Sequence, residues 1–279
     1  MRRRHWIEIH EQPWFPASLR NLTTDGLQFV WNFLGVYKPV VPLLRHALQQ
    51  IGTRRVLDLC SGGGGPWLSL VREFKEKAHF AIEVRLTDKY PNPDAVQDTQ
   101  LPKESSVVAY AEPVDAVGVP AELEGFRTIF TAFHHFRPAD ARGILEDAVR
   151  NGQGVGVFEV PKRSWRTILL VVFVPIVAFV LAPLIWPFRW SRLLWTYLIP
   201  VVPFVLWFDG VVSCLRAYTS SELLALAQGI PHHGYRWEAG EARSGRLPMT
   251  VTYLIGYPLG GQASHAPAGN NEAVIAASE

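Results

Sequence analysis

The chain has 279 residues, of which 48% are apolar and 19% are charged. This composition excludes a disordered, collagenous or disulfide-stabilised chain, and the length exceeds one minimal domain. The net charge of +2 gives no electrostatic reason to expect a nucleic-acid partner. Two cysteines, Cys60 and Cys214, cannot form a disulfide framework, so we expect a reducing compartment. The mean hydropathy of +0.09 is high for a soluble enzyme and low for a protein with many membrane spans.

The first 50 residues indicate an N-terminal helical cap. The segment MRRRHW is basic, but no apolar stretch of about 7–15 residues follows it, so we expect no signal peptide. Apolar positions spaced for one helical face predict two helical segments within 17–50. Pro39 and Pro42 are expected to separate them.

Beyond residue 50, β-rich runs alternate with helical patterns. Strands are predicted at 54–60, 80–88, 106–110, 128–133, 154–160, 235–238 and 251–257. Helices are predicted at 66–77, at 138–150 and after Thr219, where TSSE has the pattern of a capping box. This alternation predicts an α/β fold with a Rossmann-like, mostly parallel sheet flanked by helices.

One segment carries most of the excess hydrophobicity. Between residues 167 and 208, the only charged residues are Arg189 and Arg192. The uncharged run 167–186 is long enough to cross a bilayer, and the second run, 193–208, is borderline. Tryptophans near the ends of both runs suit the interfacial zone of a membrane.

These two runs predict a hydrophobic helical hairpin joined by the turn PFRWSR. Prolines at 175, 183, 187, 200 and 203 predict broken rather than straight helices. The hairpin would span the membrane or dip into it from one side; the competing interpretation is a buried lid or a dimer interface in a soluble protein. Basic residues just before the first run, at 162, 163 and 166, favour the cytoplasmic face of a membrane.

A glycine-rich loop follows the first predicted strand. In VLDLCSGGGGPWLSL, a strand ends near Asp58 and a helix begins near Trp67, which is a nucleotide-binding arrangement. A dinucleotide fingerprint would need a third glycine where Trp67 stands, and indole prevents the close helix–strand packing that this glycine permits. The NAD interpretation is therefore disfavoured.

The same segment resembles the first motif of class I S-adenosylmethionine-dependent methyltransferases, D-x-x-x-G-x-G. Three later segments continue the resemblance in order: LTDKYPN at 86–92, VDAVGVP at 114–120 and TAFHHFRP at 131–138. It covers about 51–160, with 210–258 as final helices and strands. The resemblance implies a seven-stranded sheet, methyltransferase activity and S-adenosylmethionine as cofactor.

The resemblance also implies roles for individual residues. Gly62 and Gly64 would let the main chain pass the methionine part of the cofactor, and Asp58 would attract its ammonium group, through water. Asp88 would accept the ribose hydroxyls, and Asp115 with the amide of Ala116 or Val117 would bind adenine. The remaining predicted cofactor contacts are Cys60, in a structural rather than a reactive role, and Phe133.

Two of these assignments have rivals. Glu83 competes with Asp88, because Asp88 lies 30 residues after Asp58; we favour Asp88 because it lies at the strand end, where ligands bind in open α/β sheets. Glu112 competes with Asp115.

His134 and His135 are the predicted catalytic residues, as a base or as substrate contacts. Neutral imidazole accepts a proton near pH 7, although methyl transfer to a strong nucleophile needs mainly alignment. The alternative is that one ring packs against the cofactor and the other faces solvent. The pair His232 and His233 is expected in a surface loop, and we predict no metal site.

The acceptor is predicted to be a hydrophobic small molecule or a lipid, such as a quinone or isoprenoid, methylated at the membrane surface. The aromatic N-terminal segment and the hairpin would form an apolar entrance to the site. The alternatives are a soluble acceptor with the enzyme tethered to the membrane, and a methyltransferase-like membrane scaffold without catalysis. The expected organisation is a helical cap (1–50), an α/β core (51–160), a hairpin (161–209), closing elements (210–258) and a disordered tail (259–279).

Overall fold

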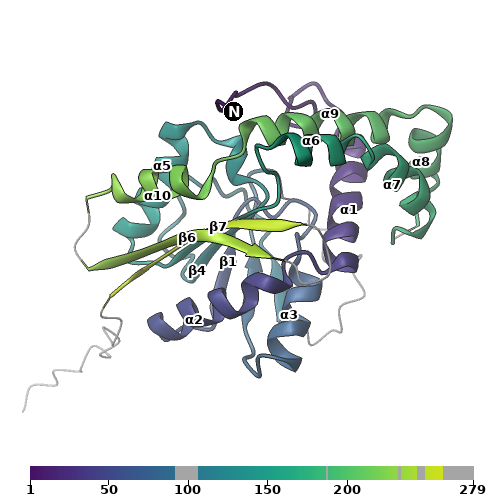
Figure 1. The fold of residues 1–279 in the computed structure, drawn as a ribbon. Helices are drawn as coiled ribbons and strands as arrows, with labels where there is room; N and C mark the ends of the chain where they lie inside the picture. The colour runs from purple at the N-terminus through teal and green to yellow at the C-terminus, as the bar shows by residue number, and fades with distance from the viewer. Residues whose placement is uncertain (92–105, 187, 232–233, 244–248, 260–279) are drawn as a thin grey trace, which may run out of the picture.

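The computed structural model describes residues 1–91, 106–186, 188–231, 234–243 and 249–259. Within them lies one seven-stranded sheet of order β3-β2-β1-β4-β5-β7-β6, in which β7 runs antiparallel to β5 and β6 (Figure 1). The strands are β1 (Arg55–Asp58), β2 (Glu83–Leu86), β3 (Val107–Ala109), β4 (Phe126–Phe130), β5 (Val155–Glu159), β6 (Tyr235–Arg243) and β7 (Thr250–Pro258). The expectation of a mostly parallel, seven-stranded α/β sheet is confirmed.

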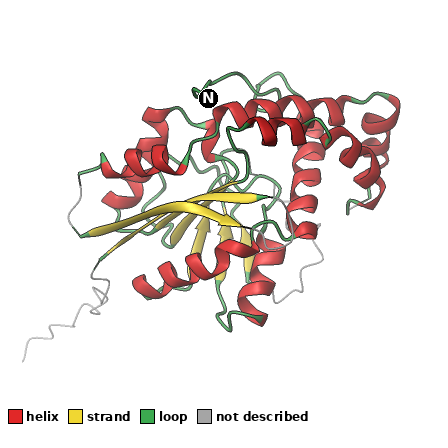
Figure 2. Cartoon of the chain, in the orientation of Figure 1, coloured by secondary structure: helices red, strands yellow, loops and turns green. Residues whose placement is uncertain are grey.

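Helices cover both faces of the sheet (Figure 2). One face is covered by α2 (Val41–Ile51) and α3 (Trp67–Glu76), and the other by α5 (Pro138–Arg150) and α10 (Ser220–Gln228). Strands β1, β4 and β5 therefore carry apolar side chains toward both layers, and β4 and β5 are buried along their whole length. The predicted capping box is present, since Thr219 accepts from the amide of Glu222 and Glu222 reaches back to the amide of Thr219.

The N-terminal region differs from the expected cap of residues 1–50. Helix α1 (Ala17–Leu34) ends at Gly35, whose φ of +60° closes the helix in the left-handed conformation. The break expected at Pro39 and Pro42 therefore occurs earlier, and both prolines stand instead in the first turn of a new helical segment. Residues 36–48 belong to the main core, because α2 packs on β7.

The hydrophobic segment forms a two-armed hairpin beside α1 (Figure 1). The first arm consists of α6 (Trp165–Val171), α7 (Val174–Leu181) and η3 (Ala182–Leu184), and the second of α8 (Trp190–Leu193), the π-helical turn η4 (Leu194–Leu198) and α9 (Val201–Arg216). The breaks lie next to prolines, as expected. Helix α9 is continuous across the predicted boundary between 209 and 210, because its last two turns pack on the body of the protein.

The remaining expectations concern the C-terminus and one histidine pair. Strand β6 is longer than the predicted 235–238, since its pairing with β7 continues to Arg243. Residues 260–279, which make up nearly all of the predicted tail, lie outside the described residues. The same holds for His232 and His233.

Candidate functional site

The glycine loop lies at the point where the strand order reverses, between β1 and β4, where open α/β sheets bind ligands. It leaves β1 at Asp58 and enters α3 at Trp67. Gly62 and Gly64 have φ of +51° and +100°, a region that L side chains rarely adopt. A Cβ on Gly64 would lie 2.8 Å from Nε2 of Gln28. The loop therefore favours glycine at this position for its conformation, while the end of the Gln28 side chain could move away from a Cβ.

The Asp58 carboxylate is 1% exposed and holds the loop in place. Thr128 Oγ1 donates to Asp58 Oδ1 at 2.6 Å, and Ser61 Oγ donates to Oδ2 at 2.8 Å. Burial raises the pKa of Asp58 to about 7; the two hydroxyls partly oppose this effect, and the nearby Asp88 adds to it. A cationic ligand would favour the ionised form, so the ammonium contact predicted for Asp58 is electrostatically reasonable and stays a prediction.

Asp88 lies two residues beyond the carboxyl end of β2, beside the glycine loop. Its Oδ2 accepts from the Gly62 amide at 2.9 Å, and its Oδ1 accepts from the Tyr90 amide at 2.8 Å. Its rival Glu83 is the first residue of β2, opposite Arg55, and is exposed at the far end of the strand. The geometry thus brings Asp88 rather than Glu83 to the loop.

Asp115 and Ala116 follow β3 and come near the Asp88 segment, since the Val114 amide donates to the Asp88 carbonyl at 2.9 Å. Asp115 is exposed, accepts from the Val117 amide and pairs with Lys89 Nζ at 2.9 Å. These bonds lower the pKa of Asp115, with Lys89 contributing most. Its predicted adenine contact therefore lies at the rim of the site.

Cys60 has a φ of +57°, which is strained for a residue with a Cβ. Burial raises its pKa well above the usual value, and the neighbouring carboxylates of Asp88 and Asp58 raise it further. A thiol that stays protonated is a poor nucleophile, which agrees with a structural role.

Helix α1 lies over the glycine loop, a contact that the sequence did not predict. Asn32 Nδ2 donates to the Gly65 carbonyl at 2.9 Å, and Asn32 Oδ1 accepts from the Ser69 amide at 2.8 Å. The Thr24 backbone and Gln28 lie within 4 Å of the Cβ position of Gly63. The sequence did contain a signal for this contact. Thr24, Gln28 and Asn32 are polar and spaced four residues apart, so they lie on one face of a helix that was predicted from its apolar positions.

The histidine pair lies in the 3-10 turn η2 (Phe133–His135), directly after β4. His134 is 1% exposed, its Nδ1 lies 2.6 Å from Glu159 Oε2, and the Phe133 amide donates to Glu159 Oε1 at 2.7 Å. The Phe133 ring is buried against Tyr218 and Phe136, so in this structure it belongs to the core. Its predicted cofactor contact stays untested.

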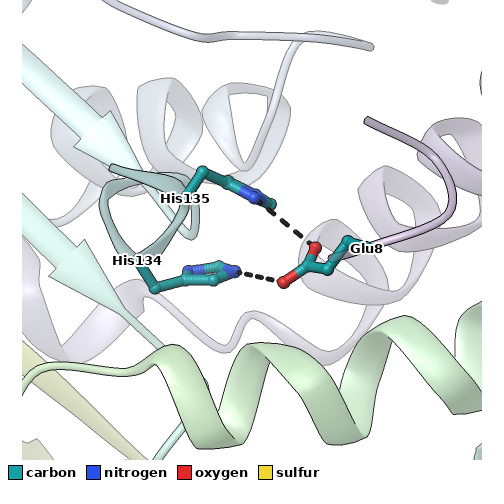
Figure 3. Close-up of side chains that lie close together, drawn as sticks. All are labelled: Glu8, His134 and His135. Carbon is teal, nitrogen blue, oxygen red and sulfur yellow. Dashed lines mark ion pairs between the residues drawn. The ribbon is translucent and has the colours of Figure 1, made fainter. Parts of the chain in front are cut away.

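Glu8, from the N-terminal segment, completes a three-residue group with the two histidines (Figure 3). Its Oε1 lies 3.7 Å from His134 Nε2, and its Oε2 lies 3.4 Å from His135 Nδ1. The Glu8 side chain is fully buried, and its pKa is lowered because the histidines and Arg216 outweigh the effect of burial. Burial lowers the pKa of His135. Burial also opposes the charged form of His134, but Glu159 and Glu8 together outweigh it and raise the pKa of that ring.

Further charged residues surround this group. Arg216 Nη1 lies 3.1 Å from Glu8 Oε1 and 2.8 Å from Glu11 Oε2. Asp209 accepts from the amides of Ile9 and His10, at 2.7 and 3.1 Å, and fixes the N-terminal segment against α9. Glu8, Glu11, Asp209 and Arg216 were not predicted from the sequence. The signals available were the alternation of histidine and glutamate in HWIEIHE and the acid that interrupts an apolar helix at 209.

The hairpin exposes a large apolar surface. Its exposed hydrophobic residues are Trp165, Leu169, Leu170, Val172, Phe173, Ile176, Val177, Val180, Leu184, Trp186, Phe188, Trp190, Leu194, Tyr197, Leu198, Ile199 and Phe204. The stretch Trp165–Leu184 has a mean hydropathy of 2.8, is 6% buried and is long enough for one membrane span. The second arm is long and apolar enough for a span only if Trp190–Leu198 and Val201–Arg216 are counted together, and these two helical pieces are bent by 74° relative to each other.

No family model and no curated protein matches this sequence. Solved structures do: the plantazolicin methyltransferase BpumL in complex with SAH aligns at a TM-score of 0.53 and 8% identity, covering 89% of this chain and 94% of that one. Human N-acetylserotonin methyltransferase, in complex with SAM, aligns at a TM-score of 0.47 and 12% identity over 85% of this chain and 56% of that one. With its strand order, the chain has the class I methyltransferase fold.

Proposed function

We propose that this protein is a S-adenosylmethionine-dependent methyltransferase that methylates a hydrophobic small molecule or lipid at the cytoplasmic face of a membrane. The observation that carries the proposal is that two features follow the carboxyl ends of strands in the same sheet. A glycine loop with Asp58 and Asp88 lies at the switch point of a class I methyltransferase fold, and an exposed apolar hairpin begins directly after β5.

The residues around the loop suit the cofactor. The carboxylate of Asp88 still has lone pairs for the ribose hydroxyls after accepting from two amides, because each carboxylate oxygen accepts more than one hydrogen bond. The buried Asp58 favours a positively charged ligand, which the methionine ammonium provides. The open space at the Cβ position of Gly62 leaves room for close approach of a ligand to the main chain.

His134 supplies the chemistry on the acceptor side. Its bond to Glu159 orients the ring, and the neutral ring, with its Nε2 lone pair free, would accept the proton of an acceptor hydroxyl. The carbon–sulfur bond of the cofactor breaks as the acceptor attacks the methyl group, so alignment supplies most of the rate.

The apolar surface supports a membrane-bound acceptor. Soluble monomers rarely expose contiguous apolar patches of more than a few hundred Å², and here both arms of the hairpin are exposed. Trp6 and Trp14 of the N-terminal segment are also exposed. Of the basic residues before the hairpin, Lys162 and Arg163 bind Glu241 and Glu222 of the body, so the first arm is anchored at its base.

Calorimetric titration with S-adenosylmethionine tests the cofactor half of the proposal. Saturable binding is expected, with at least about tenfold weaker affinity in Asp88→Ala, which removes a charge-assisted hydrogen-bond acceptor. Glu83→Ala, at the other end of the same strand, is the matched control and should bind as wild type. Absence of saturable heat in the wild-type protein would refute the enzyme and support a scaffold.

Liposome flotation tests the membrane half. The double variant Leu169→Asp with Val180→Asp should leave the lipid fraction, since both side chains are 64% exposed on the first arm. Val108→Asp is the matched control, because Val108 is 60% exposed on the edge strand β3. A wild-type protein that stays at the bottom of the gradient would exclude membrane binding.

The class of acceptor can be determined by following a labelled methyl group into the organic or the aqueous phase. Incubation with methyl-labelled S-adenosylmethionine and membranes of the host cell should transfer label into the organic phase. Label confined to small molecules in the aqueous phase would instead favour the soluble-acceptor alternative.

A further inference from the structure

We propose that Glu8, His134 and His135 bind a divalent transition-metal ion beside the proposed acceptor site. This inference replaces the expectation of no metal that came from the sequence, where Glu8 lies more than 120 positions before the two histidines. It rests on the geometry of the three side chains and not on the proposed methyl transfer, but a bound ion would occupy the His134 lone pair and exclude that ring as the base.

The ligand atoms lie close enough to share one ion. One ring nitrogen of each histidine and a carboxylate oxygen of Glu8 all lie within 4.8 Å of one another. Glu8 Oε2 lies 3.4 Å from Nδ1 of His135, and Glu8 Oε1 lies 3.7 Å from Nε2 of His134. Tetrahedral zinc with bonds of about 2.0–2.1 Å places its ligand atoms about 3.3 Å apart, so small side-chain shifts suffice.

Two of these atoms are buried without a hydrogen-bond partner among the described residues, namely His134 Nε2 and Glu8 Oε2. Buried polar atoms are nearly always satisfied, so an orphaned nitrogen beside an orphaned carboxylate oxygen indicates a missing ligand. The two side chains belong to segments distant in sequence and face each other (Figure 3).

The surroundings of His134 are those of a metal-bound histidine. His134 Nδ1 donates its proton to the Glu159 carboxylate, so in the neutral ring the lone pair is on Nε2. Nε2 is the atom that faces Glu8. A carboxylate behind a ligating histidine is the usual outer partner, since it fixes the tautomer and raises the basicity of the ligand. Glu159 is itself held by the Phe133 amide.

The local charge also favours a cation. Four carboxylates gather here, those of Glu8, Glu11, Glu159 and Asp209. The Arg216 guanidinium contacts Glu8 and Glu11, and His10 pairs with Asp209 at 2.8 Å and lies 3.6 Å from Glu8 Oε2. Two imidazolium rings would repel each other at the 4.1 Å that separates the centroids of His134 and His135. A dication supplies positive charge with both rings neutral. In the structure Glu11 contacts Nδ1 of His135, so this carboxylate would have to release the nitrogen to the ion and would then lie next to the site as a further oxygen donor.

Two nitrogens and one carboxylate oxygen suit zinc, iron(II), cobalt(II) or manganese(II) rather than calcium or magnesium, which prefer oxygen ligands. The test uses Zn²⁺ and Co²⁺ alone, without cofactor or acceptor, on the full chain in detergent. We expect about one ion per chain by elemental mass spectrometry after purification, and a visible Co²⁺ absorption band that Zn²⁺ abolishes.

The variants separate a built site from adventitious binding. Glu8→Gln and His134→Ala should weaken Co²⁺ affinity at least about 100-fold, and Glu159→Gln about 10–100-fold. His46→Ala, an exposed histidine on α2, should bind as wild type. If the buried variants do not melt cooperatively, His135→Ala takes their place, because its ring is 21% exposed, and it should likewise weaken Co²⁺ affinity.

Metal content well below one ion per chain together with no Co²⁺ band would overturn the proposal. Equal affinity in Glu8→Gln, His134→Ala and wild type would also overturn it. Neither result bears on cofactor binding, which the titration of Asp88→Ala measures separately.

Discussion

Replacing Asp58 by asparagine should make the protein more stable at alkaline pH relative to wild type. In the folded protein burial raises the pKa of Asp58 from 3.8 to about 7. As the pH rises, this carboxyl therefore ionises first in the unfolded chain and later in the folded one, so folding loses stability from about pH 4 to about pH 7. Above pH 7 the full difference remains, about 4 kcal/mol. Asparagine cannot ionise and escapes this cost.

Urea unfolding in detergent, at pH 4.5 and pH 8.5, measures the effect as the difference between Asp58→Asn and wild type. Because part of the cost is already present at pH 4.5, the variant should gain about 3 kcal/mol on wild type between the two pH values. Asp115→Asn is the control: Lys89 lowers the pKa of this exposed carboxyl, so its smaller effect should have the opposite sign. An Asp58→Asn difference that is the same at both pH values would refute the reasoning.

Three further substitutions probe the loop, the core and a helix end. Gly64→Ala should weaken S-adenosylmethionine binding in calorimetry, because a φ of +100° strains a residue that has a Cβ and because this Cβ would meet the Gln28 side chain. The double variant Gly64→Ala with Gln28→Ala should not recover binding, since the backbone strain remains. Asp147→Asn should lower the free energy of unfolding by about 3–5 kcal/mol in urea, because it leaves the buried guanidinium of Arg127 uncompensated; a loss below about 1 kcal/mol would contradict this. Thr219→Ala removes the side-chain cap of α10 and should cost about 1 kcal/mol, with Thr219→Ser as the near-neutral control.

The fold was predictable because its signals are local. A β-rich run, a glycine loop and an amphipathic helix occur in order around Asp58, and the spacing of later strands followed the same alternation. The preference for Asp88 over Glu83 rested on which end of a parallel strand faces the ligand, and the hydrogen bond to the Gly62 amide agrees with it. The capping box at Thr219 is equally local.

The group formed by Glu8, His134 and His135 was not predictable, because its contacts join segments that are far apart in the sequence. Glu8 reaches His134 only when the N-terminal segment docks on α9, which depends on Asp209 accepting from the amides of Ile9 and His10. No periodicity encodes that contact. The helix break at Gly35 was missed for another reason: proline is the stronger sequence signal, but it also begins helices, as Pro42 does here.

Helix α9 connects the exposed apolar hairpin to the charged residues around His134. It starts at Val201 among the exposed apolar residues of the hairpin and ends at Arg216, which contacts Glu8 and Glu11. Because α9 is one continuous helix, a tilt of its hairpin end would also move Asp209 and Arg216 against the histidines. If the hairpin inserts in lipid as proposed, the angle of insertion is therefore coupled to the spacing of these side chains. A variant cut at residue 209 would lose this coupling and would remove Asp209 together with the exposed apolar arms.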